Sequence, residues 1–179
     1  MEENGAQSVK AFIGVGSNIE PERNIVEALS VLASRMPLLA LSSFYFTVAL
    51  QDRAQCDYIN GVVLIECHCS PKSLKLDILR PIEKGQGRVR SEDKYASRPI
   101  DLDLLAYGDV VVEEAELSIP DPDLREHGFL QVAMLEVAPD FVFPDTGEKL
   151  SCMVGEQDAR SLRRATEFTL RLKERFCHE

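Results

Sequence analysis

Apolar residues recur along the first part of the chain with the period of a strand, then of a helix, then of strands again. Val9 to Val15 is β-branched and apolar and runs into a Gly-Ser-Asn turn, which predicts a first strand. Pro21 suits a first helical turn, and apolar residues follow it at spacings of four, three and four: Ile25, Leu29, Leu32 and Met36. We therefore expect a helix over about 21–36, followed by strands within 38–50 and 58–66 that a polar loop joins.

The middle of the chain adds a second helix and another strand. Ser70-Pro71 is typical of a helix start, and apolar residues recur every four positions after it, which predicts a helix over about 71–84. Pro81 lies beyond the first turn, where proline costs about 3 kcal/mol, so we expect a kink or an early end. A long loop over 85–99 then leads into a strand at 100–107.

The rest of the chain is predicted to hold a hairpin and two helices. Val110 to Val112 and Glu116 to Ile119 suit a short hairpin, and Phe129 to Ala138 suits a third helix that Pro139 ends. The whole order predicts a ferredoxin-like α+β sandwich, with helices on one face of an antiparallel sheet. We expect 1–8 to be a flexible N-terminus, 9–150 one domain, and 151–179 a C-terminal amphipathic helix packed on the domain or on a partner.

Composition narrows the classes of protein. The net charge of −10 argues against an extended nucleic-acid surface, and there is no 18-residue apolar run that could cross a membrane. The polar start lacks the pattern of a signal peptide, so we expect a cytoplasmic protein. Five cysteines without paired CxxC spacing argue against both a disulfide framework and a zinc site.

The segment RPIDLDLL (98–105) places two acids in an otherwise apolar strand. Residues two apart share a face of a strand, so Asp101 and Asp103 point together, and Ile100, Leu102 and Leu104 point to the other face. Two carboxylates roughly 6 Å apart repel by about 3 kcal/mol at an effective dielectric of 20, and a divalent cation with a phosphate substrate would relieve this. Alternatively, the acids pair with nearby arginines on an exposed face.

The loop before this strand is basic in an otherwise acidic chain. It carries two glycines and the cations Lys84, Arg88, Arg90, Lys94 and Arg98. This loop can act as a mobile clamp for polyphosphate. Because acids such as Glu83 and Glu92 lie among the cations, a solvated surface of mixed charge remains the alternative.

GQGRVR (85–90) followed by RPIDLDLL resembles the signature of the 6-hydroxymethyl-7,8-dihydropterin pyrophosphokinase family of folate biosynthesis. The resemblance covers about residues 9–150 and includes the Gly16-Ser17-Asn18 turn, which we interpret as a family turn and not a phosphate cradle. It implies a ferredoxin-like fold, a monomer, and transfer of pyrophosphate from ATP to the pterin hydroxymethyl group with release of AMP and use of two magnesium ions.

The resemblance also implies roles for single residues. Asp101 and Asp103 match the metal ligands and Arg88 and Arg98 the catalytic polyphosphate clamps. The pterin side is matched by Thr47, Tyr58, Asn60 and Phe129, in which the two aromatic rings stack on the heterocycle. The ATP side is matched by Glu83, Arg88, Arg90, Tyr95, Arg98, Ser118, Asp121 and His127.

Departures from the family pattern gather on the nucleotide side. Asp121 stands where the family usually has a phosphate-contacting histidine, and Pro122 follows where an aromatic residue is common. His127 stands where arginine is frequent, and Glu116 where a basic residue occurs. A carboxylate beside polyphosphate should weaken ATP binding. This leaves open an alternative, a catalytically weakened paralogue that acts as a pterin-binding module.

Overall fold

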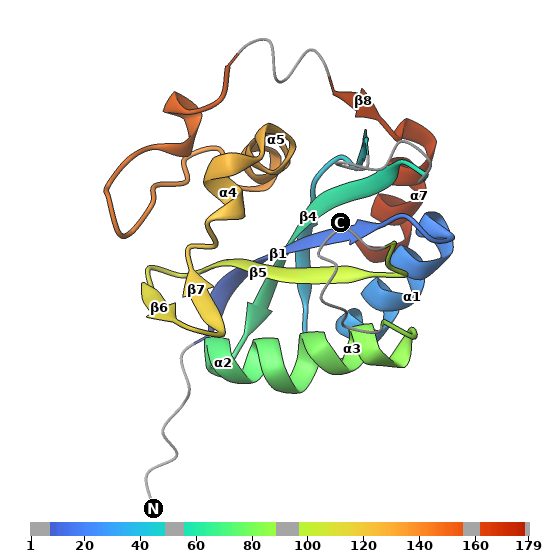
Figure 1. Cartoon of the computed structure of the whole chain (residues 1–179), viewed down its shortest axis with the longest axis horizontal. Helices are drawn as coiled ribbons and strands as arrows, with labels where there is room; N and C mark the ends of the chain where they lie inside the picture. The colour runs from blue at the N-terminus through green and yellow to red at the C-terminus, as the bar shows by residue number, and fades with distance from the viewer. Residues whose placement is uncertain (1–7, 49–55, 89–96, 156–161, 178–179) are drawn as a thin grey trace, which may run out of the picture.

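One antiparallel sheet forms the centre of the molecule (Figure 1). The structure, a computed structural model, describes residues 8–48, 56–88, 97–155 and 162–177. The elements in chain order are β1 (Val9–Ser17), α1 (Pro21–Ala33), β2 (Leu38–Leu41), β3 (Tyr45–Thr47), β4 (Tyr58–Cys67), α2 (Pro71–Ser73), η1 (Leu74–Leu79), α3 (Arg80–Gly85), β5 (Asp101–Tyr107), β6 (Val112–Glu114), β7 (Leu117–Ile119), α4 (Asp123–Glu126), α5 (Gly128–Val137), η2 (Leu150–Cys152), β8 (Arg163–Arg164) and α7 (Thr166–Phe176).

The strand order confirms the predicted ferredoxin-like α+β class. The sheet runs β5-β1-β4-β3-β8, and β2 pairs with another stretch of β4. Every pair in it is antiparallel. The predicted hairpin is present as β6 and β7, which form a separate two-stranded sheet.

Helices cover both faces of the sheet, so the expectation of helices on one face is wrong. One core lies under α1, the second helix and α7, and it takes Ala11, Ile13 and Val15 from β1. The other core lies under α5, and it takes Phe12 from β1 and Leu105 from β5. The central strands carry apolar residues at consecutive positions, which is what a sheet buried on both faces needs.

The second helix continues from Pro71 to Gly85 through one widened segment. Leu74–Leu79 is π-helical, and the N–H of Arg80 donates to the carbonyl of Lys75, five residues back. Pro81 follows at once, and its ring would press on the carbonyl four residues back in a regular helix. The wider turns accommodate the proline, so the helix is confirmed and the expected early end is wrong.

The residues after 155 contribute to the sheet as well as a helix. β8 pairs with β3 at the edge, and the helix occupies only Thr166–Phe176 of the range predicted for it. Phe168 and Leu172 of α7 are 3% and 1% exposed and belong to the core that α1 shares. The C-terminal segment therefore packs on the rest of the fold, as Figure 1 also shows.

Candidate active site

Strand register brings the predicted site residues into rows on the α5 face of the sheet. Gly16 of β1 lies opposite Asn60 of β4 on one side and Asp101 of β5 on the other. Two residues earlier on β1, Gly14 lies opposite Asp103. Thr47 of β3 lies opposite Tyr58 of β4. Neighbouring strands are about 4.8 Å apart, so the residues predicted to bind pterin and those predicted to bind metal lie on either side of a glycine.

The face opposite Asp101 and Asp103 is apolar, as the alternation predicts. Ile100, Leu102 and Leu104 are at most 3% exposed and belong to the core under α1. The two acids therefore face the α5 side together with Leu105, and the acids remain partly accessible there.

The part of this face that α5 leaves open is a pocket of about 380 Å³. Its walls come from β1, β3, β4, β5 and the α4–α5 segment, and the predicted site residues among them are Thr47, Tyr58, Asn60, Arg98, Asp101, Asp103, His127 and Phe129. The wall also contains residues that we did not predict: Gly14, Val15, Gly16, Val48, Leu105, Asp123 and Leu130. A mixed apolar and polar wall of this size suits a small heterocycle next to a charged group.

Gly16 leaves room for the side chain of Asn60. A Cβ at position 16 would collide with the Asn60 Oδ1 atom. The side chain of Asn60 instead occupies the space next to the glycine, and its Nδ2 donates to Thr47 Oγ1 at 2.6 Å. The missing side chain thus makes room for the Thr47–Asn60 pair in the pocket wall.

Asp101 is bound by two arginines. One of its carboxylate oxygens accepts a hydrogen bond from Arg88 Nη1 and the other from Arg98 Nη1. Arg88 Nη1 also binds Glu83, whose Oε1 accepts the Leu102 N–H at 2.9 Å. Glu83 is 3% exposed, so a buried carboxylate behind β5 holds Arg88 in place for Asp101.

Asp103 has the opposite environment. Burial raises the pKa of its carboxyl well above the usual range, and the negative charges of Asp101, Asp121 and Glu83 raise it further. Arg88 lowers this pKa, but by less. The position therefore has too little positive charge nearby, which favours a proton or a metal cation at this carboxylate.

The Gly-Ser-Asn turn holds the segment that carries Arg98. Asn18 Oδ1 accepts the Arg98 N–H at 2.8 Å, and Asn18 Nδ2 donates to Ser97 Oγ at 3.2 Å. Ser17 Oγ donates to the Pro99 carbonyl at 2.5 Å. Sequence reasoning missed this role, because the bonds join positions about 80 residues apart and no local pattern reveals them.

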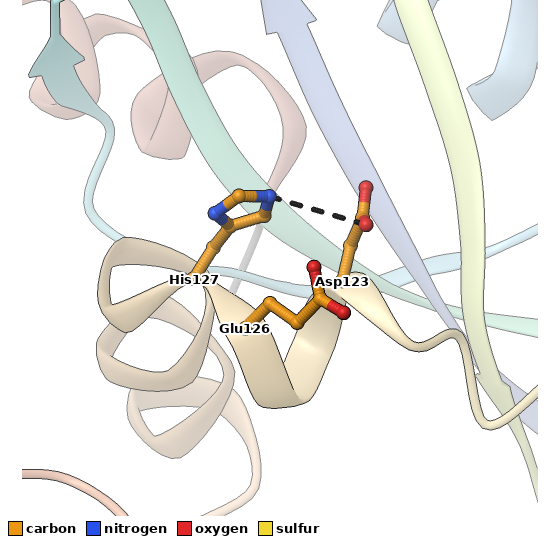
Figure 2. A group of neighbouring side chains, drawn as sticks. All are labelled: Asp123, Glu126 and His127. Carbon is orange, nitrogen blue, oxygen red and sulfur yellow. Dashed lines mark ion pairs between the residues drawn. The ribbon is translucent and has the colours of Figure 1, made fainter. Parts of the chain in front are cut away.

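The α4–α5 segment forms the remaining wall of the pocket. His127 stacks on Phe129 with ring centroids 5.6 Å apart. Figure 2 shows the His127 ring directed at Asp123, with Nε2 and a carboxylate oxygen 3.9 Å apart. Each of Asp123, Glu126 and His127 has a possible metal-ligand atom within 4.8 Å of the others', yet the two acids are exposed, as solvated side chains on one helical turn commonly are.

Several predicted residues lie away from the pocket wall. Ser118 lies on β7. Arg88 contacts the pocket residue Asp101, and Glu83 contacts Arg88. Asp121 donates its N–H to the Leu105 carbonyl at 2.8 Å and accepts the Asp123 N–H at 2.9 Å. Burial raises the pKa of Asp121, and its charge reaches Asp103 electrostatically. Arg90 and Tyr95 lie outside the described residues.

The fold and the site together define an α+β domain that sets paired carboxylates and arginines beside a pocket with aromatic walls. The chain belongs to the 7,8-dihydro-6-hydroxymethylpterin-pyrophosphokinase family, whose model matches residues 12–139. The resemblance seen in the sequence is thereby confirmed.

Relatives of the same name are similar over most of their length. The chain is 38% identical to the 2-amino-4-hydroxy-6-hydroxymethyldihydropteridine pyrophosphokinase of Haemophilus influenzae over 141 residues, which are 77% of this chain and 87% of the relative. It is 37% identical to the protein of that name from Synechocystis over 155 residues, 85% of this chain and 78% of the relative.

A solved structure confirms the fold. The Plasmodium falciparum HPPK-DHPS crystal structure with SDX-DHP matches with a TM-score of 0.64 at 11% identity. The match covers 97% of this chain and 47% of that one, so the chain spans about half of the solved protein.

Among the described residues, no helix combines the length and apolar character needed to cross a membrane.

Proposed function

We propose that the pocket transfers pyrophosphate from ATP to the hydroxymethyl group of 6-hydroxymethyl-7,8-dihydropterin, with magnesium held at Asp101 and Asp103. Membership of the family makes the chain a pyrophosphokinase of folate biosynthesis. The observation that carries the residue-level proposal is the pair of adjacent carboxylates, facing one pocket, of which one already binds two guanidiniums.

The donor set suits magnesium. Both side chains offer hard carboxylate oxygens, and Asp103 lies among further negative charges that raise its pKa. Magnesium bound with ATP would neutralise charge on the phosphates and orient them. We propose two ions, as the family resemblance implies.

The side chains of this protein would position the reacting groups. Arg88 and Arg98 can exchange the Asp101 carboxylate for phosphate oxygens, because the N–H groups of a guanidinium bind both kinds of anion. Tyr58 and Phe129 would stack on the pterin ring, and Asn60 would read its edge through an amide that Thr47 orients. The hydroxymethyl oxygen then bonds to the β-phosphorus of ATP and gives up its proton to solvent, the bond from this phosphorus to the α,β-bridging oxygen breaks, and AMP leaves with that oxygen.

The alternative of a weakened pterin-binding paralogue gains no support from the comparisons. Asp121, which motivated it, lies outside the pocket wall, as does Glu116. Glu116 instead forms an ion pair with Arg80 at 3.8 Å.

We propose a cytoplasmic enzyme that acts as a monomer, and its five free thiols suit a reducing compartment.

An assay of AMP release tests the proposal. Purified protein with ATP, magnesium and hydroxymethyldihydropterin should release one AMP for each pterin diphosphate formed, and EDTA should stop the reaction. If ATP and pterin both bind but no AMP forms, the proposed function is wrong and the weakened paralogue is correct. Turnover that persists without a divalent cation would contradict the magnesium assignment alone.

A further inference from the structure

A connection between two strands begins and ends at the pterin side of the pocket. β3 ends at Thr47 and β4 begins at Tyr58, and these two residues lie opposite each other in the sheet. Both line the pocket, and Thr47 also orients Asn60. The spacing of this strand pair therefore sets the width of the pterin side.

One side chain from the C-terminal strand contacts both ends of the connection. The guanidinium carbon of Arg163 lies 4.0 Å from the ring centroid of Phe46, the residue before Thr47. Arg163 Nη2 lies 2.8 Å from Oδ2 of Asp57, the residue before Tyr58. Arg163 thus binds the neighbours of two pocket residues at once.

Arg163 contacts β3 on the face of the sheet opposite the pocket. Adjacent residues of a strand point to opposite faces, so Phe46 lies on the α1 face while Thr47 faces the pocket. Arg163 is opposite Phe46 in the β3–β8 pair, and the next residues hold the same strand: the Ala165 N–H donates to the Phe44 carbonyl at 2.8 Å. Backbone pairing therefore fixes the position from which the Arg163 side chain reaches Phe46 and Asp57.

We propose that Arg163 is a positioning residue for the pterin side of the pocket, a role that rests on the proposed function. It keeps Thr47 and Tyr58 at the spacing that lets the ring of Tyr58 and the Thr47–Asn60 pair contact one heterocycle. It touches neither substrate. It acts on pterin binding and leaves the carboxylates and arginines of the phosphate side unchanged.

Steady-state kinetics of Arg163→Ala test this role. The KM for hydroxymethyldihydropterin should rise about fivefold, as expected for the loss of one exposed ion pair and one cation–π contact. The kcat and the KM for ATP should stay within about twofold of wild type, because the phosphate side is untouched. Arg163→Lys keeps the ion pair and should recover part of the loss, and Asp57→Asn should raise the same KM.

Arg171→Ala is the matched control. Arg171 also leaves the C-terminal segment to bind an acid on the body of the fold, Glu22. Its side chain is 58% exposed, compared with 65% for Arg163, and it lies on the α1 side, away from the pocket. An equal rise in the pterin KM for Arg171→Ala, or a rise in the KM for ATP that matches the pterin effect, would mean general loosening and would overturn the proposal.

A binding measurement separates this inference from the proposed function. Calorimetry of hydroxymethyldihydropterin with a non-hydrolysable ATP analogue and magnesium needs no turnover. Weaker pterin binding by Arg163→Ala supports the role even if the wild type releases no AMP. If the wild type releases AMP, and Arg163→Ala binds pterin with unchanged affinity and has an unchanged pterin KM, the role of Arg163 is refuted. The proposed enzyme activity would then still stand.

Discussion

At the scale of single residues, Asp101 and Asp103 differ more than their spacing suggests. Asp101 binds two guanidiniums, whereas Asp103 faces mainly other carboxylates. Ion pairs therefore stabilise the charge of Asp101, whereas the charge of Asp103 destabilises the fold. A destabilising charge of this kind is typical of sites where function is kept at the expense of stability.

Asp101→Asn and Asp103→Asn should separate turnover from stability. Both should lower AMP release by about a hundredfold or more, because each removes a carboxylate proposed to hold magnesium. Asp101→Asn should also lower the melting temperature, since Arg88 and Arg98 each lose one ion pair in a partly buried site. Asp103→Asn relieves repulsion, so its melting temperature should rise by about 2–4 °C for each kcal/mol gained. An equal loss of stability in both variants would contradict this reading.

Gly16→Ala should damage the pterin side alone. The added Cβ meets Asn60 Oδ1 and must displace this side chain from Thr47. We expect the pterin KM to rise about tenfold, the cost of about one hydrogen bond. Gly85→Ala is the control, because no atom outside its own helix lies within 4 Å of a Cβ there. A pterin KM that is unchanged in Gly16→Ala would show that Asn60 does not read the pterin.

At the scale of elements, the position of α5 decides where the pocket opens. Glu136 of α5 accepts hydrogen bonds from the Tyr45 hydroxyl and from the Ser43 N–H, the latter at 2.5 Å. Arg164 of β8 binds the same carboxylate at 3.0 Å. One acid therefore joins α5 to β3 and to the edge strand β8.

This junction predicts an acid-sensitive contribution to stability. Burial alone would raise the pKa of Glu136, but the hydrogen bonds of Tyr45 and Ser43 and the charge of Arg164 outweigh it and hold this pKa below the usual 4.5. A carboxylate whose pKa is lower in the folded state stabilises the fold at pH values above its unfolded-state pKa. This stabilisation is lost as the pH falls through the folded-state pKa. Glu136→Gln should therefore lose less stability between pH 5 and pH 3 than wild type, measured by urea unfolding, and parallel curves would refute the coupling.

At the scale of the whole molecule, the C-terminal segment is part of the core. Leu172 is 1% exposed, whereas Leu170 on the same helix is 56% exposed. Leu172→Ala should lower the free energy of unfolding by about 2–5 kcal/mol, and Leu170→Ala by less than about 0.5 kcal/mol. Chemical denaturation measures both. Equal small losses would mean that α7 packs loosely and could serve a partner instead.

The sequence predicts this architecture where periodicity carries the signal. The acidic face of β5, the first helix and the hairpin follow from spacing, because alternation and helical repeats survive in any context. Coverage of both faces, the edge strand β8 and the π-helical segment do not follow, since each depends on packing between distant parts of the chain. The same holds for Asn18, whose partners lie at residues 97 and 98.

The paired arginines on Asp101 have a consequence for how ligands enter. Because both oxygens of this carboxylate already have guanidinium partners, the pocket carries its own counterions. In the proposed reaction, a cation that took the carboxylate would release Arg88 and Arg98 from Asp101 for phosphate, so metal and nucleotide would bind by an exchange of partners that leaves few charges uncompensated. Such an exchange releases few ions to the solvent, and the affinity for magnesium–ATP should fall less steeply with added salt than at a site of unpaired arginines.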